Sequence, residues 1–188
     1  MPNGLFVFTR VEGPAAGRIR DIQQRYDPKF AAMHAPHLTL AGSSGVGPIL
    51  GSVPIEDVRA ALARVASATQ PLSLPFGPPK RFMQTEIVTL PLDPHGPLRE
   101  LHDRIARSGL VFGSARFTFT PHVTLSFYPT LTRERERELL SLRIDEPAQF
   151  TTLTVSATDD PMPPQPLFEL PLGGRPPDDP LARADEGG

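Results

Sequence analysis

The sequence predicts an α+β protein built from two similar halves, and three observations support this prediction. Short runs with apolar residues at alternate positions, typical of strands, separate segments with apolar residues at helical spacing. The same order of segments repeats within the 188 residues. A five-residue word repeats with it, as PHLTL at 36–40 and PHVTL at 121–125. An internal repeat indicates similar lobes, so we expect a bilobal fold with two antiparallel sheets and outer helices around a central groove that carries both words.

The first half is predicted to contain three strands and two helices. Ile19, Ile22 and Tyr26 lie at helical spacing, and Pro14 suits the first turn of their helix. Ser52 is a suitable N-cap for a second helix, which has its own apolar stripe. In chain order, we expect a strand at 5–11, a helix at 14–27, a strand at 37–43, a helix at 52–67 and a strand at 71–77.

The second half repeats this order and adds closing strands. Gly109 is a suitable C-cap for its first helix, and Thr132 is a suitable N-cap for its second, highly charged helix. Pro121 interrupts the strand that contains the second word. In chain order, we expect a strand at 86–93, a helix at 97–109, a strand at 117–127, a helix at 131–142, and strands at 149–159 and 165–172.

These elements predict a single domain over residues 1–172. Its lobes are expected at about 1–79 and 80–172, and this assignment leaves room for strands to exchange between the lobes. Residues 173–188 contain almost no apolar side chains, so we expect them to form a disordered tail. We expect the protein to be a monomer.

The composition narrows the class of function. The chain has no cysteine, which excludes disulfides, thiolate zinc sites and cysteine nucleophiles and fits a cytoplasmic location. No apolar run approaches the roughly 20 residues that span a bilayer, so we expect no membrane association. The net charge is −2, whereas a protein that holds long nucleic acid through phosphate contacts is usually more basic. Any nucleic-acid partner is therefore expected to be a short segment or an end.

The repeated word carries groups suited to phosphodiester chemistry. Side chains alternate along a strand, so His37 and Thr39 project from one face, as do His122 and Thr124. An imidazole titrates near pH 6.5, so one can act as acid while the other acts as base near neutrality. A threonine hydroxyl can donate a hydrogen bond to a phosphate oxygen as charge develops there. These four residues are therefore the predicted catalytic set, and the chemistry needs no metal or cofactor.

The two words resemble the paired His-x-Thr motifs of the 2H phosphoesterase superfamily, and specifically its 2′-5′ RNA ligase-like (RNA 2′,3′-cyclic phosphodiesterase) branch. The resemblance covers most of residues 4–172. It implies a bilobal α+β fold and an enzyme that opens 2′,3′-cyclic phosphate ends of RNA or nucleotides to 2′-phosphates without metal or ATP. Some members of the branch also join or cleave 2′-5′ linkages. The repeat makes the two histidines nearly equivalent, so the residues alone do not decide which one is the acid. The resemblance favours His37 as the acid toward the leaving O3′ and His122 as the base toward water.

One departure from the family pattern concerns the residues after the second motif. Many ligase-like members place an arginine there, and this chain has Ser126, Phe127 and Tyr128. A basic group that neutralises the phosphate must then come from another segment. Our candidates for substrate binding, from segments expected to border the groove, are Lys80, Arg81, Phe82, Arg116, Ser126, Phe127 and Tyr128.

Three alternatives compete with this hypothesis. A binding module of the same fold would hold a nucleotide or an RNA end without turning it over. A His-x-Thr pair can also be a half-buried feature of strand packing. His34 lies three residues before His37 and suggests a metal-dependent hydrolase, but Pro36 lies between them and no carboxylate is close in sequence. We therefore expect no metal site.

The other features of the sequence have simpler interpretations. We interpret His95 as a loop residue and His102 as a helix-surface residue. The glycine-rich stretch at 42–47 lacks the lysine of a nucleotide-binding P-loop, so it is expected to be a flexible connection that borders the groove.

Overall fold

The structure is a computed structural model that describes residues 4–158 and 164–173. The helices are α1 (Pro14–Tyr26), α2 (Pro28–Met33), α3 (Ile55–Ser67), α4 (Gly96–Ala106) and α5 (Arg133–Ser141). The strands are β1 (Leu5–Arg10), β2 (His37–Ala41), β3 (Leu72–Leu74), β4 (Lys80–Arg81), β5 (Val88–Pro91), β6 (His122–Ser126), β7 (Ala148–Phe150), β8 (Thr152–Ala157) and β9 (Gln165–Pro171). The predicted disordered tail lies outside the described residues, apart from Gly173.

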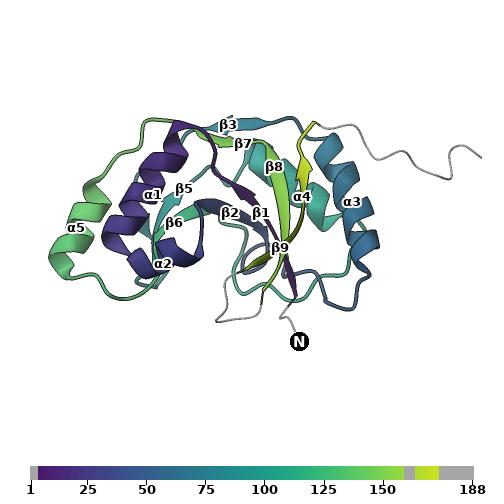
Figure 1. The fold of residues 1–188 in the computed structure, drawn as a ribbon, viewed down its shortest axis with the longest axis horizontal. Helices are drawn as coiled ribbons and strands as arrows, with labels where there is room; N and C mark the ends of the chain where they lie inside the picture. The colour runs from purple at the N-terminus through teal and green to yellow at the C-terminus, as the bar shows by residue number, and fades with distance from the viewer. Residues whose placement is uncertain (1–3, 159–163, 174–188) are drawn as a thin grey trace, which may run out of the picture.

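The strands form one large and one small antiparallel sheet, which confirms the α+β prediction. The large sheet has seven strands in the order β4-β5-β6-β2-β1-β8-β9, and the small sheet pairs β3 with β7. Figure 1 shows α1, α2 and α5 at one end of the molecule and α3 and α4 at the other, with the strands between them. Both repeated words lie in the large sheet, on the neighbouring strands β2 and β6.

The internal repeat is visible in the order of the strands. β2 and β6 are adjacent, β1 lies beside β2, and β5 lies beside β6 in the matching place. In the chain, β1 is followed by helix α1 and β5 is followed by helix α4. The small sheet also takes one strand from each half. The helices cross between halves, since α1 packs against β6 and α4 packs against β2. The two halves of the sequence therefore interleave in space.

The apolar residues of the two words anchor their strands in the core. Leu38, Leu40, Val123 and Leu125 are all fully buried. Helix α1 contributes Ile19 to the same core, and α4 contributes an apolar face of its own at Leu98, Leu101 and Ile105. Because burial of one large aliphatic side chain is worth about 1.5–3 kcal/mol, this face of the sheet fixes the strands. The opposite face is left for the histidines and threonines.

Prolines explain several differences between the expected and observed boundaries. Pro121 lacks an N–H for the ladder, and β6 begins only after it, so residues 117–121 of the strand predicted at 117–127 lie outside β6. Helix α3 begins after Pro54 rather than at Ser52. Pro28 begins the short helix α2, which the sequence analysis missed. The two-residue strand β4 was also missed, since it is too short to show a period.

Polar caps explain the remaining boundaries. Thr132 caps α5 as predicted, because its hydroxyl accepts a hydrogen bond of 3.3 Å from the Arg135 N–H. Helix α4 ends with Arg107 as its C-cap, and Gly109 lies in the turn beyond it with a φ of 87°. The predicted strand at 149–159 is divided into β7 and β8, which belong to different sheets, and its last residue lies outside the described part. Within the described residues, every helix is too short or too polar to cross a bilayer.

Candidate active site

The two His-x-Thr motifs lie side by side at the centre of the large sheet. The antiparallel ladder pairs Leu38 with Val123. One residue further in each direction, His37 lies opposite Thr124 and Thr39 lies opposite His122. We call the face that carries these four side chains the motif face. The two histidines therefore lie diagonally across the β2–β6 boundary, and each has the threonine of the other motif directly opposite it.

Each motif histidine is held by the backbone two residues before it. The Nδ1 atom of His37 lies 2.8 Å from the Ala35 carbonyl oxygen, and Nδ1 of His122 lies 2.7 Å from the Thr120 carbonyl oxygen. A carbonyl only accepts, so Nδ1 carries the hydrogen in both rings and Nε2 is the second, exchangeable position. Both rings are half-buried. The repeat thus gives two imidazoles with the same tautomer and the same type of support.

The surroundings lower the pKa of both histidines. Burial is the first cause for each ring, because it disfavours the charged imidazolium. The hydrogen bonds to Ala35 and Thr120 oppose this effect and raise the pKa. The positive charge of His37 contributes to the low pKa of His122, and so does Lys80. The strand register, which places the rings diagonally across β2 and β6, agrees with this influence of His37 on His122.

Aromatic rings lie against both histidines. Phe8 lies 5.2 Å from the His37 ring, and Phe82 lies 4.5 Å from the His122 ring, measured between centroids. Phe82 is buried and also meets Phe117 edge-on at 5.3 Å. Phe82 is one of the residues predicted from the sequence to contact substrate. In the structure its ring supports His122 directly.

A side chain from α1 donates a hydrogen bond to β6, the second motif strand. The Gln23 Nε2 atom donates a hydrogen bond of 2.7 Å to the Thr124 carbonyl oxygen, and Gln23 is buried. The β2–β6 ladder contains only one residue pair, Leu38 with Val123. The Gln23 side-chain amide therefore gives the Thr124 carbonyl a hydrogen-bond partner beside this short ladder. The sequence analysis did not select Gln23. The only available signal was a polar residue four positions from Ile19 on the buried face of a helix.

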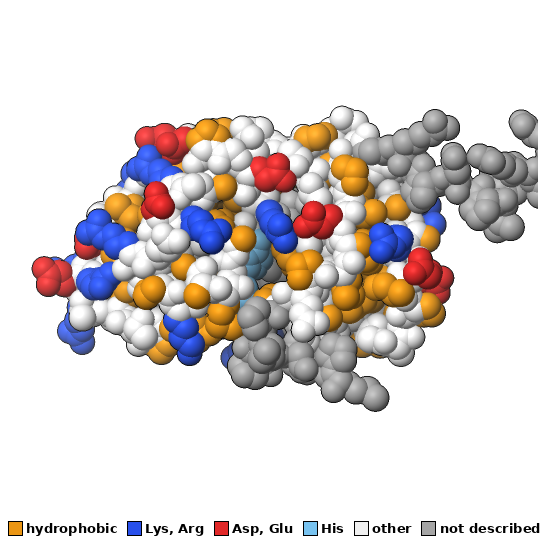
Figure 2. All heavy atoms as spheres, in the orientation of Figure 1, with side chains coloured by type: hydrophobic (Ala, Val, Ile, Leu, Met, Phe, Trp, Pro, Cys, Tyr) orange, Lys and Arg blue, Asp and Glu red, His pale blue; other side chains and the backbone are white. Residues whose placement is uncertain are grey.

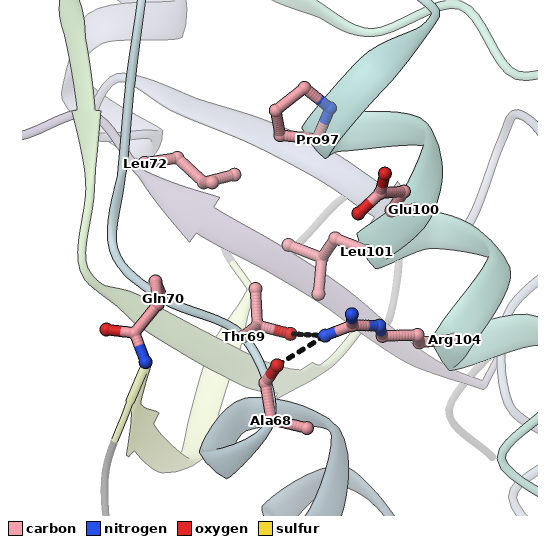
Figure 3. A pocket seen from close by; sticks show the side chains of 8 residues that line it. All are labelled: Ala68, Thr69, Gln70, Leu72, Pro97, Glu100, Leu101 and Arg104. Atoms are coloured by element: carbon pink, nitrogen blue, oxygen red, sulfur yellow. Dashed lines mark hydrogen bonds between the residues drawn. The ribbon is translucent and has the colours of Figure 1, made fainter.

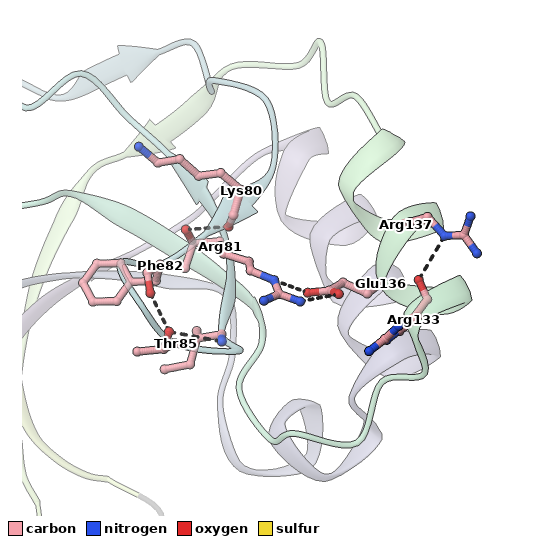
Figure 4. A network of polar contacts seen from close by, with 9 residues as sticks. Lys80, Arg81, Phe82, Thr85, Arg133, Glu136 and Arg137 are labelled. Atoms are coloured by element: carbon pink, nitrogen blue, oxygen red, sulfur yellow. Dashed lines mark hydrogen bonds and ion pairs between the residues drawn. The ribbon is translucent and has the colours of Figure 1, made fainter.

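Two of the predicted basic residues point in opposite directions from β4. Lys80 pairs in register with Thr89, which pairs with Thr124, so Lys80 belongs to the motif face. Arg81 points the other way, toward α5 (Figure 4). Its Nε and Nη2 atoms bind the two carboxylate oxygens of Glu136 at 2.5 and 2.6 Å. Of these two neighbours, Lys80 is the one the structure brings toward the histidines.

Arg116 is exposed and reaches the motif face only indirectly. Its guanidinium carbon lies 5.2 Å from the centroid of the Phe117 ring, which meets Phe82. Two rings therefore separate Arg116 from His122. Its backbone N–H donates to the Ser43 carbonyl at 3.1 Å, which joins this segment to the glycine-rich loop.

The residues after the second motif are organised by a buried carboxyl group. The Asp27 Oδ2 atom accepts hydrogen bonds from the backbone N–H groups of Phe127 and Tyr128 at 2.8 and 2.9 Å. It also lies 3.5 Å from the Ser126 hydroxyl, and Ser126 is fully buried. Phe127 is 47% exposed and stacks on Phe30 at 5.9 Å. Of the two aromatic rings in this segment, the ring of Phe127 is more exposed than that of Tyr128.

The interpretation of His102 as a surface residue is wrong, because this ring is buried and holds the glycine-rich loop. Its Nε2 atom accepts a hydrogen bond of 3.2 Å from the Val46 N–H, and Nδ1 lies 3.0 Å from an Asp103 carboxylate oxygen. Gly45 has a φ of 77°, and a Cβ there would lie 2.2 Å from Nε2. His95, in contrast, is exposed as expected, as the N-cap of α4. The sequence pattern showed a charged helix surface and gave no sign of this loop contact.

The candidate site is the motif face, and two pockets lie elsewhere. Figure 2 shows a histidine side chain in a hollow near the middle of one face, with basic and acidic side chains beside it. A pocket of about 240 Å³ lies between the end of α3 and α4, with Arg104 bound to Thr69 (Figure 3). Another, of about 310 Å³, lies beside Arg81 and Tyr128. Neither pocket includes a motif residue. We therefore locate the candidate site by the chemistry of the side chains on the motif face.

Comparison with known proteins identifies the family. The family model of the 2′-5′ RNA ligase superfamily matches residues 11–160. This chain belongs to the 2′-5′ RNA ligase superfamily. Its members are 2H phosphoesterases, which agrees with the paired histidine motifs on β2 and β6. A protein of Geobacillus kaustophilus (strain HTA426), named as a candidate phosphoesterase, is 30% identical over 113 residues. That alignment spans 57% of this chain and 62% of the relative.

Solved structures with the same fold cover nearly the whole of this superfamily member. A crystal structure of a phosphoesterase has a TM-score of 0.52 at 20% identity, over 92% of this chain and 99% of the other. Escherichia coli LigT in complex with 3′-AMP has a TM-score of 0.52 at 19% identity, over 91% of this chain and 98% of LigT. LigT in its apo form has a TM-score of 0.51 at 21% identity, over 92% and 98%. At these identities the similarity establishes the fold.

In this superfamily member, the motif face can supply two proton-transfer groups and two hydrogen-bond donors. Each imidazole has its Nδ1 engaged by a backbone carbonyl, so proton exchange takes place at Nε2. Among residues 4–158 and 164–173, the structure gathers no set of three or more histidine, aspartate or glutamate side chains that could hold a metal ion. The motif side chains can therefore donate and accept protons.

Proposed function

We propose that this protein is a phosphodiesterase that opens 2′,3′-cyclic phosphate ends of RNA or nucleotides to 2′-phosphates. One observation carries the proposal. The motif face presents two half-buried imidazoles of the same tautomer, diagonally across adjacent strands, with a threonine hydroxyl opposite each one. This set matches the needs of a cyclic phosphodiester, where one oxygen must gain a proton while another loses one.

The proposed reaction assigns one role to each motif residue. A water molecule attacks phosphorus while Nε2 of His122 takes its proton, and a new P–O bond forms. The bond from phosphorus to O3′ breaks, and Nε2 of His37 gives its proton to that oxygen. The hydroxyls of Thr39 and Thr124 donate hydrogen bonds to the nonbridging oxygens, where negative charge increases. The product is a 2′-phosphate with a free 3′-hydroxyl, and the two histidines have exchanged protonation states.

Electrostatics allow the pair to supply one acid and one base. The charge of His37 is among the causes that lower the pKa of His122, and repulsion between two imidazolium ions disfavours the state in which both rings are charged. When the pair carries one proton, one ring is neutral, as a base must be, and the other is charged, as an acid must be. The family resemblance assigns the acid to His37 and the base to His122.

The comparisons support a nucleotide substrate without naming it. LigT, which shares the fold, was crystallised with 3′-AMP, and the curated relative is named as a candidate phosphoesterase. We propose RNA ends or small cyclic nucleotides as substrates, with turnover that needs neither metal nor ATP. We also propose that the protein acts as a monomer in the cytoplasm. Formation of a 2′-5′ RNA linkage would use the same acid–base pair, with a 5′-hydroxyl in place of water as the nucleophile and O3′ again as the leaving oxygen.

A turnover assay tests the proposal directly. We expect the protein to convert 2′,3′-cyclic AMP to adenosine 2′-phosphate, with ³¹P NMR or chromatography against the 2′- and 3′-phosphate standards as the readout. The rate should be unchanged in excess EDTA, because the two imidazoles move all the protons. Loss of turnover in EDTA, with recovery on addition of zinc or manganese, would contradict the metal-independent mechanism.

A non-catalytic binding module is the second candidate, and the residues after the second motif favour it. Ser126 is buried and Phe127 and Tyr128 have their backbone N–H groups bound to Asp27, so this segment offers no cation to the phosphate. The two candidates differ in the same assay. A binding module would retain affinity for the cyclic nucleotide and would form no product, even at high protein concentration.

A further inference from the structure

Arg10 is a cation beside His37 that the sequence analysis did not select. The β1–β2 ladder pairs Arg10 with His37 and Phe8 with Thr39. Residues paired across antiparallel strands project from the same face of a sheet, so Arg10 lies on the motif face. Its positive charge is among the causes that lower the pKa of His37, which shows that the guanidinium lies near this ring.

One row of side chains crosses the motif face and ends in a cation on each side. The registers connect Lys80 to Thr89, Thr89 to Thr124, and His37 to Arg10, while the β2–β6 pairing sets Thr124 opposite His37. Strands in a sheet are about 4.8 Å apart. A phosphate at the β2–β6 boundary would therefore lie about 7 Å from the Arg10 strand position and about 12 Å from that of Lys80.

The guanidinium of Arg10 is available to an anionic ligand. Arg10 is 45% exposed, and its ion pair with Glu169 on β9 is 3.4 Å long. Charge-assisted hydrogen bonds are usually about 2.7–2.9 Å, and exposed ion pairs contribute about 0–1 kcal/mol. Glu169 therefore orients Arg10 without holding it firmly. The planar fork of an arginine also fits the oxygens of a phosphate better than a lysine does.

We propose that Arg10 binds a second phosphate of the substrate, on the 5′ side of the nucleotide whose cyclic phosphate reacts. The proposal rests on the proposed function, which sets the reacting phosphate between His37 and His122. The distance from that position to Arg10 is comparable to the separation of the two phosphates that flank one ribose. The substrate is then a 5′-phosphorylated nucleotide, either free or as the end of an RNA chain.

Equilibrium binding of two ligands that differ by one phosphate tests the role of Arg10. Isothermal titration calorimetry would compare adenosine 2′-monophosphate with adenosine 2′,5′-bisphosphate. We expect the wild-type protein to bind the bisphosphate more tightly by on the order of 10-fold, which corresponds to about 1.4 kcal/mol. Arg10→Ala should abolish this preference and leave the affinity for the monophosphate unchanged. Neither measurement requires turnover.

Two control variants make the test specific to Arg10. Arg25→Ala removes an exposed arginine that is paired with Glu138 on the outer helices, and it should keep the preference. Lys80→Ala removes the cation at the other end of the row, and it should keep the preference too. Loss of the preference in Lys80→Ala instead, equal loss of affinity for both ligands in Arg10→Ala, or absence of a preference in the wild type would each overturn the proposal.

The outcomes separate this inference from the proposed function. Failure of the wild-type protein to bind adenosine 2′-monophosphate would contradict the proposed function itself, since no phosphate would lie between the histidines. Normal binding of the monophosphate without a 5′-phosphate preference would contradict the role of Arg10 alone. A diadenosine ending in a 2′-phosphate distinguishes the two sources of the 5′-phosphate. Binding as tight as that of the bisphosphate indicates an RNA end, and weaker binding indicates a free nucleotide, with the Arg10→Ala loss expected in both cases.

Discussion

At the residue scale, the central feature is the fixed tautomer of the two motif histidines. Ala35 and Thr120 each hold an Nδ1–H group through a backbone carbonyl, so a side-chain mutation at either position leaves this contact in place. Nε2 is thus the nitrogen that can exchange a proton in both rings. The charge of His37 is among the causes that lower the pKa of His122, and repulsion between two charged rings disfavours their joint protonation. Two nearly equivalent residues can therefore be in different protonation states at the same pH.

The lowered pKa values predict an acidic optimum for the free enzyme. The proposed reaction needs one neutral and one protonated imidazole, so the two limbs of the kcat/KM profile report the two apparent pKa values of the His37–His122 pair. Both pKa values lie below the ordinary value of 6.5, because burial disfavours the imidazolium. We expect a bell-shaped profile of kcat/KM with its maximum below pH 6.5, measured with 2′,3′-cyclic AMP. A maximum above about pH 7 would show that burial does not control the two rings.

At the element scale, Asp27 joins the α1–α2 corner to the end of β6. Its Oδ1 atom accepts a hydrogen bond of 3.0 Å from the Phe30 N–H and so caps α2. Its Oδ2 atom accepts from the N–H groups of Phe127 and Tyr128. This buried carboxyl group fixes the direction in which the chain leaves the second motif. It also explains why the segment after β6 carries out a structural role.

Removal of this junction should destabilise the protein more than removal of an ordinary helix cap. We expect Asp27→Ala to lower the free energy of unfolding by about 2 kcal/mol or more, because three backbone N–H groups lose their acceptor. The matched control is Thr132→Ala, which removes only the cap of α5 and should cost about 1 kcal/mol. Urea unfolding followed by circular dichroism measures both. Equal costs for the two variants would show that Asp27 is only a cap.

The sequence was informative wherever a period or a repeated word was present. Alternation located β2 and β6, and the helical spacing of Ile19 and Tyr26 located α1. Gln23 could not be found in this way, because its role depends on which strand lies beneath α1. The contact of His102 with Val46 is equally non-local, since it joins residues 56 positions apart. Arg10 was overlooked because its relation to His37 is a strand register, which no local pattern encodes.

At the scale of the whole molecule, the two halves of the sequence exchange supports. Helix α1 lies under β6 and α4 lies under β2, so each motif strand rests on a helix from the other half. The small sheet again joins β3 to β7 across the halves. One hydrophobic cluster includes Ile19 of the first half and Leu125 of the second. Neither half therefore has a complete core of its own.

This interleaving predicts a single cooperative unfolding transition. Differential scanning calorimetry should give a calorimetric enthalpy equal to the van't Hoff enthalpy, as expected for a two-state domain. Expression of the two halves as separate chains, divided within residues 82–87 between β4 and β5, should give unfolded fragments. Two resolved transitions, or a folded isolated half, would mean that the lobes are independent.

We propose that His37 and His122 act together as acid and base, and alanine variants of the two rings measure this pairing. With 2′,3′-cyclic AMP, we expect His37→Ala and His122→Ala each to lower kcat/KM by ~10²-fold or more. The double variant should lose less than the product of the two, because groups that act as a unit are not additive. His95→Ala, which removes an exposed histidine at the start of α4, should remain near the wild type. A change of less than twofold on removal of both motif histidines would contradict the account.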